Sequence, residues 1–180
     1  MHDYNDLIRI FNHCFLSTYN TRLIKGVDEP IYRPASDKQP FNAIYFAHGF
    51  FSSALHECAH WFIAGEQRRK LIDYGYWYIP DGRNAQEQAL FQQVEVKPQA
   101  LECLLSTAAG YKFQLSVDNL DGEPGDIVSF KQAIREQIKH YQQQLPRRAA
   151  IFYHALHDFY APLVKIDLEQ QLLSLSVDGC

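Results

Sequence analysis

The clearest chemical pattern in the sequence is a pair of histidines four residues apart, His56 and His60, in the pentapeptide HECAH. On an α-helix this spacing nearly matches the repeat of about 3.6 residues, so both imidazoles lie on one face, one turn apart. The two rings can converge on one metal ion, and Glu57 beside them can carry protons or orient a ligand. The alternative is a pair of ordinary histidines on a partly buried helix. The pattern favours a metal site, and a metal-dependent enzyme is the leading hypothesis.

The residues around the pentapeptide carry the signals of a helix. Ser52 or Ser53 can cap its first turn, and Gly65 can end it. Apolar residues fill the positions between these signals, namely Ala54, Leu55, Ala59, Trp61, Phe62, Ile63 and Ala64. Cys58 lies two residues from each histidine, about 200° away around the helix, so it points elsewhere and is expected to be a buried thiol.

Two histidines leave a divalent metal undercoordinated, so a third protein ligand is expected. The downstream candidates are Glu87, Glu95, Glu102, His140, His154 and His157. Glu87 and Glu102 fall within regular helical patterns and are more simply interpreted as solvated positions. Glu95 stands just before the helix break expected at Pro98, where a carboxylate can be aimed inward. Spacing alone does not exclude the other two glutamates, and His48 is a further candidate for a place near the metal.

Composition and charge narrow the class of protein. The 180 residues are 47% hydrophobic and 21% charged, which is typical of one globular domain. A net charge of −4 argues against nucleic-acid binding and suits a cationic substrate or a basic partner. The sequence shows no basic leader before an apolar run and no apolar stretch approaching roughly 18 residues, so neither export nor membrane insertion is expected. The four cysteines show no CxxC pairing, and a cytoplasmic location is expected.

The spacing of apolar residues predicts an α+β domain in which helices predominate. Besides the metal-binding helix, helices are expected over 7–15, 84–94, 99–109, 128–145 and 146–160. Pro98 is expected to end or kink the helix that Asn84 caps, or to lie in the first turn of the next helix, which Gly110 ends. Short strands are expected around 31–32, 73–79 and 113–117, and the run 43–47 is a strand or the lead-in to the metal-binding helix.

Several short motifs together resemble the bacterial elongation factor P hydroxylase family. They are NTRLIKG (20–26), DEPIY (28–32), FAHGF (46–50), HECAHW (56–61), GYWYIPDGR (75–83), VEVKPQAL (94–101), AAGY (108–111) and DNL (118–120). The resemblance spans residues 4–120 in register and is looser through the C-terminal helices. It implies that His56, His60 and Glu95 bind the metal. It also implies a single hydroxylase domain over 1–180, with helices packed on a small sheet and a metal-binding helix similar to that of zincins.

The resemblance further implies hydroxylation of a lysine that already carries a β-lysyl group, as the final step in the modification of elongation factor P. A site of two histidines and one carboxylate suits this reaction, because three ligands on one face of Fe(II) leave positions for O₂ and substrate. Dependence on a 2-oxo acid is not implied, since a helical motif differs from the usual iron dioxygenase pattern.

Two alternatives use the same metal ligands. In a zinc metallopeptidase or other zinc hydrolase, Glu57 would be the catalytic base that activates a metal-bound water. In the hydroxylase, Glu57 would relay protons or orient a ligand histidine. A non-catalytic binding module with a structural metal is disfavoured, because structural zinc sites have four ligands and are richer in cysteine.

A substrate that carries ammonium groups needs carboxylates near the metal. The candidates are Asp28, Glu29, Asp73, Asp81, Asp118 and Asp121, which also suit turns and caps. Asp28 and Glu29, just before Pro30, are the first choice for substrate binding. The aromatic residues 76–78 can wall a lysine channel through cation–π contacts, or pack in the core. Elongation factor P is itself a protein, so a cleft that admits a lysine-bearing loop is expected beside the metal.

Overall fold

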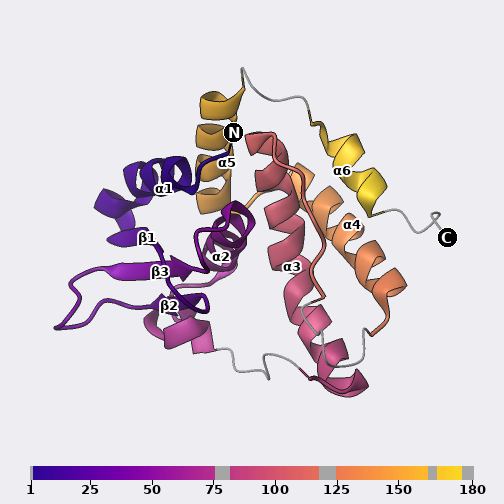
Figure 1. The fold of residues 1–180 in the computed structure, drawn as a ribbon, viewed down its shortest axis with the longest axis horizontal. Coiled ribbons are helices and arrows are strands. Elements are labelled where there is room, and N and C mark those ends of the chain that lie inside the picture. The colour runs from indigo at the N-terminus through magenta and orange to yellow at the C-terminus, as the bar shows by residue number, and fades with distance from the viewer. Residues whose placement is uncertain (1, 76–81, 118–124, 162–165, 176–180) are drawn as a thin grey trace.

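The computed structural model describes residues 2–75, 82–117, 125–161 and 166–175. These parts of the chain form six α-helices and a three-stranded sheet, which confirms the predicted α+β class with helices predominating (Figure 1). Helix α2 lies between the sheet and α3, with α1 and α5 packed beside it. None of the helices in the described ranges has the length and apolar character needed to cross a membrane.

The sheet has the strand order β1-β3-β2. Its central strand, β3 (Asn42–Phe46), pairs in parallel with β1 (Thr21–Lys25) and antiparallel with β2 (Ile31–Arg33). Strands β2 and β3 confirm the predictions at 31–32 and 43–47. Strand β1 was not predicted, because a five-residue strand with only two fully buried side chains leaves a weak alternation pattern.

Helix α2 (Phe51–Ile63) follows the central strand and carries both histidines. Neither Ser52 nor Ser53 caps it, because the N-cap is Phe50, which provides no side-chain hydrogen bond. The Ser53 hydroxyl instead accepts a hydrogen bond from the Ala47 amide at 3.0 Å, tying the helix to the chain that leaves β3. The helix ends one residue before the predicted end, a difference within the usual uncertainty of helix boundaries.

Helix α3 (Ala85–Ala109) is a single helix of 25 residues, so the break predicted at Pro98 is wrong. Asn84 begins it as predicted, in a capping box with Glu87, and Gly110 ends it with a left-handed φ of 64°. An interior proline costs a helix about 3 kcal/mol. Packing against α2, α4 and α5 along the length of α3 outweighs that cost. Tertiary contacts therefore override the local signal.

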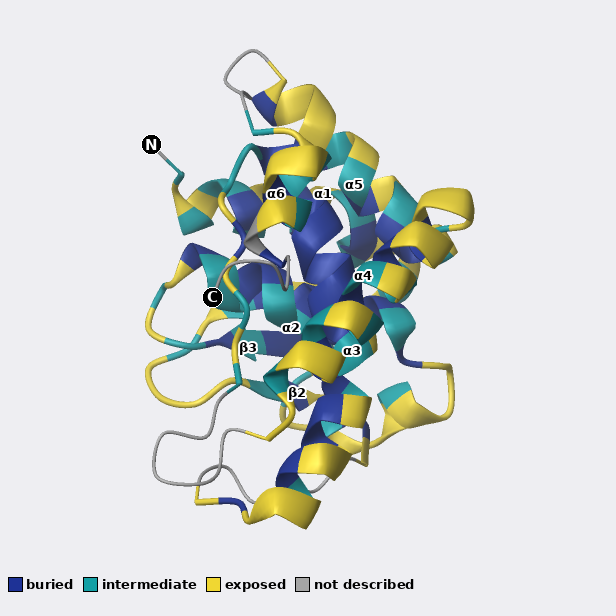
Figure 2. Cartoon of the chain, turned by 90° about the vertical axis from the view of Figure 1, so that its right-hand side faces the viewer, coloured by how far each residue is buried: buried dark blue, intermediate teal, exposed yellow. Residues whose placement is uncertain are grey.

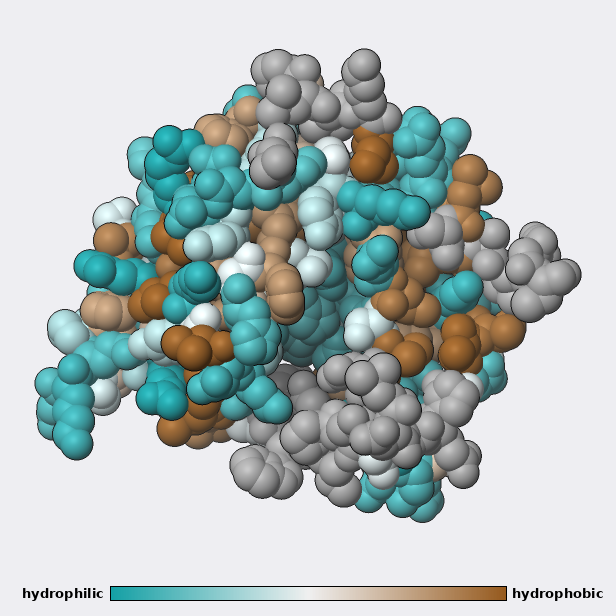
Figure 3. All heavy atoms as spheres, viewed as in Figure 1, coloured by the Kyte–Doolittle hydropathy of each residue, from teal (hydrophilic) through white to brown (hydrophobic). Residues whose placement is uncertain are grey.

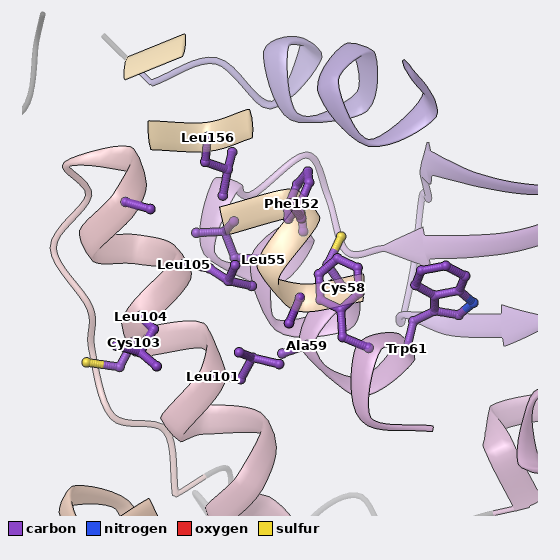
Figure 4. Close-up of a cluster of buried hydrophobic side chains, with 14 of the residues drawn as sticks. Leu55, Cys58, Ala59, Trp61, Leu101, Cys103, Leu104, Leu105, Phe152 and Leu156 are labelled. Atoms are coloured by element: carbon purple, nitrogen blue, oxygen red, sulfur yellow. The ribbon is translucent and has the colours of Figure 1, made fainter. Parts of the chain in front are cut away.

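The core lies where α2, α3 and α5 (Arg147–Tyr160) meet (Figures 2 and 4). Its side chains are Leu55, Cys58 and Ala59 of α2, Leu101, Leu104 and Leu105 of α3, and Phe152 and Leu156 of α5. Cys58 is fully buried, as predicted. Helix α1 (Tyr4–Tyr19) adds Phe11 and Phe15 against the Trp61 ring, with centroids 5.4 and 5.2 Å away. This core holds α2 from the side opposite its histidines.

The C-terminal half of the chain is mainly helical. Helices α4 (Ile127–Gln143) and α5 confirm the predictions over 128–145 and 146–160, and α6 (Leu168–Ser174) lies in the tail that the sequence left unassigned. The strand predicted at 113–117 is absent. Side-chain amides of α3 satisfy that backbone instead: Gln99 bonds both the amide and the carbonyl of Ser116, at 3.2 and 2.8 Å, and Gln88 donates to the Val117 carbonyl at 2.9 Å.

The described part of the strand predicted at 73–79 is a tight turn. Asp73, Tyr74 and Gly75 all have left-handed φ values, of 46°, 60° and 70°. A strand needs extended backbone, so the prediction is wrong for these residues. Residues 76–79 lie outside the described ranges.

Arg148 of α5 holds the C-terminal end of α2. Its guanidinium is only 8% exposed, and Nη2 donates to the carbonyls of Phe62 at 3.1 Å and Ala64 at 2.7 Å. The same group lies 4.4 Å from the centre of the Trp61 ring. A cation at this end of a helix satisfies carbonyls that have no partner within the helix and favours the helix dipole.

Replacing Arg148 with methionine should lower the free energy of unfolding by about 1–3 kcal/mol, because the Phe62 carbonyl loses its charged donor, whereas the Ala64 carbonyl keeps a hydrogen bond from Arg69. Arg147, its exposed neighbour, is the matched control, and Arg147→Met should change stability by less than about 0.5 kcal/mol. Urea unfolding followed by circular dichroism measures both. Equal effects would show that Arg148 does not support α2.

Candidate metal centre

Three side chains converge between α2 and α3. The Nε2 atoms of His56 and His60 are 3.0 Å apart, and the Glu95 carboxylate lies 3.4 Å from the first and 3.3 Å from the second. One ligand atom from each residue lies within 4.8 Å of the other two. The space-filling view shows the molecular face hollowed between these helices, with hydrophilic residues in the hollow (Figure 3). Glu95 is thus the candidate that the structure places with the histidines.

The donor atoms fit a divalent transition metal. Two ring nitrogens 3.0 Å apart repel each other if both present lone pairs, so a proton or a metal ion has to lie between or beside them. Glu95 is 1% exposed, and its Oε1 makes no hydrogen bond within the described ranges; its nearest partner is Nε2 of His60, at 3.3 Å. A buried carboxylate oxygen without a donor is costly unless a cation satisfies it. Two imidazoles and a carboxylate are suitable ligands for zinc or iron.

Glu102 orients one of the two histidines. Its Oε2 lies 2.8 Å from Nδ1 of His56, so Nδ1–H can donate to it, and Nε2 is the ring nitrogen that faces the cluster. Glu102 is 6% exposed, so its interpretation as a solvated residue is wrong. The error follows from the break predicted at Pro98. On one continuous helix, residues 95 and 102 are about two turns apart and share a face, a spacing that could have indicated the pair.

The charges of the cluster are strongly coupled. For His56, burial lowers the pKa, but the Glu95 charge and the hydrogen bond to Glu102 outweigh burial and raise the pKa to about 10. For Glu95, burial raises the pKa, but the charges of His60 and His56 lower it more, to about 2. In the absence of a metal the carboxylate is therefore ionised and a proton on the imidazoles balances it. A bound metal ion takes over that balancing role.

Glu57 lies beside the cluster and is not part of it. Its side chain is partly buried and makes no hydrogen bond or ion pair with residues in the described ranges. Burial raises its pKa, although the charges of His60 and His56 oppose that shift. A carboxylate in this position has a free oxygen with which to hold or release a proton near the metal ligands.

The other predicted candidates lie elsewhere or outside the described residues. Glu87 serves the capping box of α3, and His48 is exposed, with its ring 5.7 Å from that of Phe50. His140, His154 and His157 are exposed on α4 and α5. Asp28 and Glu29 are exposed between β1 and β2, and no contact joins them to the cluster. The candidates outside the described ranges are Tyr76, Trp77, Tyr78, Asp81, Asp118 and Asp121.

Comparison with known proteins identifies a family. The sequence model of the family described as elongation factor P hydroxylase matches residues 10–171. A curated protein of Haemophilus influenzae named elongation factor P lysine hydroxylase is 58% identical over 168 residues, which cover 93% of this chain and 94% of that protein. The match includes both α2 and α3, and therefore the whole cluster.

The ligand assignment predicts that His56→Ala, His60→Ala and Glu95→Ala each weaken metal binding by at least roughly a hundredfold, because two remaining donors leave an open site. Competition with a chromophoric chelator for Zn²⁺ measures the affinity, and circular dichroism checks the fold. Glu87→Ala removes the rival candidate and should leave the affinity unchanged. Metal loss in Glu87→Ala but not in Glu95→Ala would contradict the assignment.

The role of Glu102 predicts a graded response. Glu102→Leu should weaken metal binding roughly tenfold to a hundredfold, because nothing then holds the His56 ring. Glu102→Gln keeps an oxygen that accepts from Nδ1–H and should recover most of the affinity. The same chelator competition measures both variants. A leucine variant that binds metal as tightly as the parent would exclude an orienting role.

Proposed function

Since the chain belongs to the elongation factor P hydroxylase family, we propose that it hydroxylates elongation factor P on a lysine that already carries a β-lysyl group. This would be the final step in the modification of that factor. The observation that supports this reaction is the buried cluster of two imidazoles and one carboxylate between α2 and α3. The molecular face is hollowed between these helices, and we expect a lysine-bearing loop of the protein substrate to approach the cluster there (Figure 3).

We assign the metal to Fe(II), held by His56, His60 and Glu95, with O₂ as co-substrate. An iron ion with these three ligands keeps positions for O₂ and substrate and supplies the oxidising power that replacing a C–H bond requires. Glu102 fixes the tautomer of His56, so the Nε2 lone pair points to the metal position. Dependence on a 2-oxo acid is not part of the proposal.

Glu57 is the proposed catalytic side chain. It lies next to a metal ligand and makes no hydrogen bond or ion pair with residues in the described ranges. Its carboxylate can therefore accept or release a proton at the edge of the site. In a zinc hydrolase the same carboxylate would activate water, so the function of Glu57 distinguishes the two chemistries.

The remaining assignments concern the partner. Elongation factor P is the protein substrate, and Asp28 and Glu29 are proposed to bind its ammonium groups from the exposed loop between β1 and β2. Residues 1–180 are treated as one hydroxylase domain, which agrees with a family match over 10–171. A translation factor as substrate supports a cytoplasmic location.

Incubation with Fe(II), O₂, a two-electron reductant such as ascorbate and β-lysylated elongation factor P should add one oxygen atom to the modified lysine, while the other oxygen atom is reduced to water. The unextended lysine should be a poorer substrate, because it lacks the second ammonium. Intact-mass analysis with and without O₂ measures the reaction. Zn²⁺ in place of Fe(II) is the matched control and should give no oxygen incorporation, since zinc has no redox chemistry.

The rival chemistry has a different signature. A zinc hydrolase needs only water, so it would cleave peptides without O₂ and lose that activity in Glu57→Gln. This result, together with no oxygen incorporation under any reductant, would replace the hydroxylase assignment with a metallopeptidase.

A further inference from the structure

A strained turn packs against the metal-binding helix. Asp73 and Tyr74 are consecutive non-glycine residues with left-handed φ values of 46° and 60°. This backbone conformation is strained for residues other than glycine, and it persists only where the surroundings enforce it. Here Oδ1 of Asp73 accepts from the Tyr32 amide at 2.7 Å, and Nη1 of Arg68 donates to the Tyr74 carbonyl at 2.9 Å. The turn is thus fixed to β2 and to the chain after α2.

The turn places Tyr74 against a metal ligand. Its ring is nearly parallel to that of His60, with centroids 6.4 Å apart, and it stacks on the Tyr32 ring with centroids 4.5 Å apart. Tyr74 is 4% exposed, and its hydroxyl is buried with no hydrogen-bond partner in the described ranges. Burial raises the pKa of the Tyr74 hydroxyl, and the charges of Glu57 and Asp73 raise it further. The Tyr74 hydroxyl can therefore still donate and accept a hydrogen bond, beside the carboxylates of Glu57 and Asp73.

Asp73 is a carboxylate near the cluster that does not pair with a histidine of the cluster. Glu95 and Glu102 are engaged by the histidines, whereas neither Asp73 nor Glu57 forms an ion pair in the described ranges. Asp73 directly precedes Tyr74, whose ring lies nearly parallel to that of His60 with centroids 6.4 Å apart. Burial raises the pKa of Asp73, while the Tyr32 amide, His60 and Arg33 lower it. Arg33 is exposed and does not come within ion-pair distance of Asp73.

We propose that Asp73 is a specificity-determining residue that binds an ammonium group of the substrate's lysine-derived side chain. Tyr32 uses only Oδ1, so Oδ2 remains for a charge-assisted hydrogen bond to the ligand. A substrate cation placed here also relieves the repulsion between Asp73 and Glu57. The inference rests on the proposed function, because it takes the substrate to be a lysine-derived cation.

The variant Asp73→Asn isolates the charge. Asparagine tolerates a left-handed φ and keeps an oxygen that accepts from the Tyr32 amide, so the turn is retained. The KM for β-lysylated elongation factor P should rise roughly tenfold to a hundredfold, with kcat, iron content and the unfolding midpoint little changed. Asp37→Asn is the matched control. Asp37 is exposed in the turn between β2 and β3, at the end of the sheet away from the start of α2, and its variant should match the parent.

A second arm measures affinity without turnover. Calorimetry with the zinc-loaded protein compares β-lysylated elongation factor P with the same protein after acetylation of its amines. Asp73→Asn should weaken binding of the unacetylated form tenfold or more and leave binding of the acetylated form unchanged, because only an ammonium can sense the lost charge. A purely structural role would weaken both forms equally.

The outcomes separate the two proposals. If the parent hydroxylates the factor but Asp73→Asn matches it in KM and in affinity, the inference about Asp73 is overturned and the proposed function stands. If Asp28→Asn or Glu29→Gln raises KM and Asp73→Asn does not, the ammonium site lies in the other loop. If the parent never incorporates oxygen, the proposed function fails, and the affinity arm still decides whether Asp73 binds an ammonium.

Discussion

The contact between two carboxylates of α3 and two imidazoles of α2 is the interaction on which the rest of the structure depends. Glu95 and Glu102 are almost fully buried, and an ionised carboxylate without a partner is too costly to bury. The imidazoles of His56 and His60 provide that partner. In return, Glu102 holds Nδ1 of His56, and the Nε2 atoms of both rings lie within 3.4 Å of the Glu95 carboxylate, where a metal ion can replace the balancing proton.

The surrounding elements hold the two helices at the required distance. Helix α2 packs against the aromatic residues of α1 and against Phe152 of α5, and Arg148 binds the carbonyls at the C-terminal end of α2. On α3, Gln99 lies within 3.5 Å of the Glu95 carboxylate and also bonds the Ser116 backbone. A segment without regular structure is thereby tied to a candidate metal ligand. Preorganisation of this kind keeps ligand atoms in place before the metal binds.

The local part of the site could be predicted from the sequence. The HECAH spacing predicts both histidines on one helical face, and Asn84 and Gly110 mark the two ends of α3. What escaped prediction depends on contacts between distant residues. Packing carries α3 through Pro98, which places Glu102 on the same face as Glu95. The left-handed turn at Asp73 and the segment braced by Gln99 likewise depend on partners far away in the sequence.

Anomalous diffraction can show whether α2 and α3 together hold one metal ion at the cluster of His56, His60 and Glu95. Crystals of protein loaded with Fe(II) under anaerobic conditions would be measured on both sides of the iron absorption edge. The account predicts one iron peak at about 2.0–2.3 Å from Nε2 of His56, Nε2 of His60 and the Glu95 carboxylate, with Glu102 still bonded to Nδ1 of His56. An iron peak held by other side chains, or by Glu102 in place of Glu95, would contradict it.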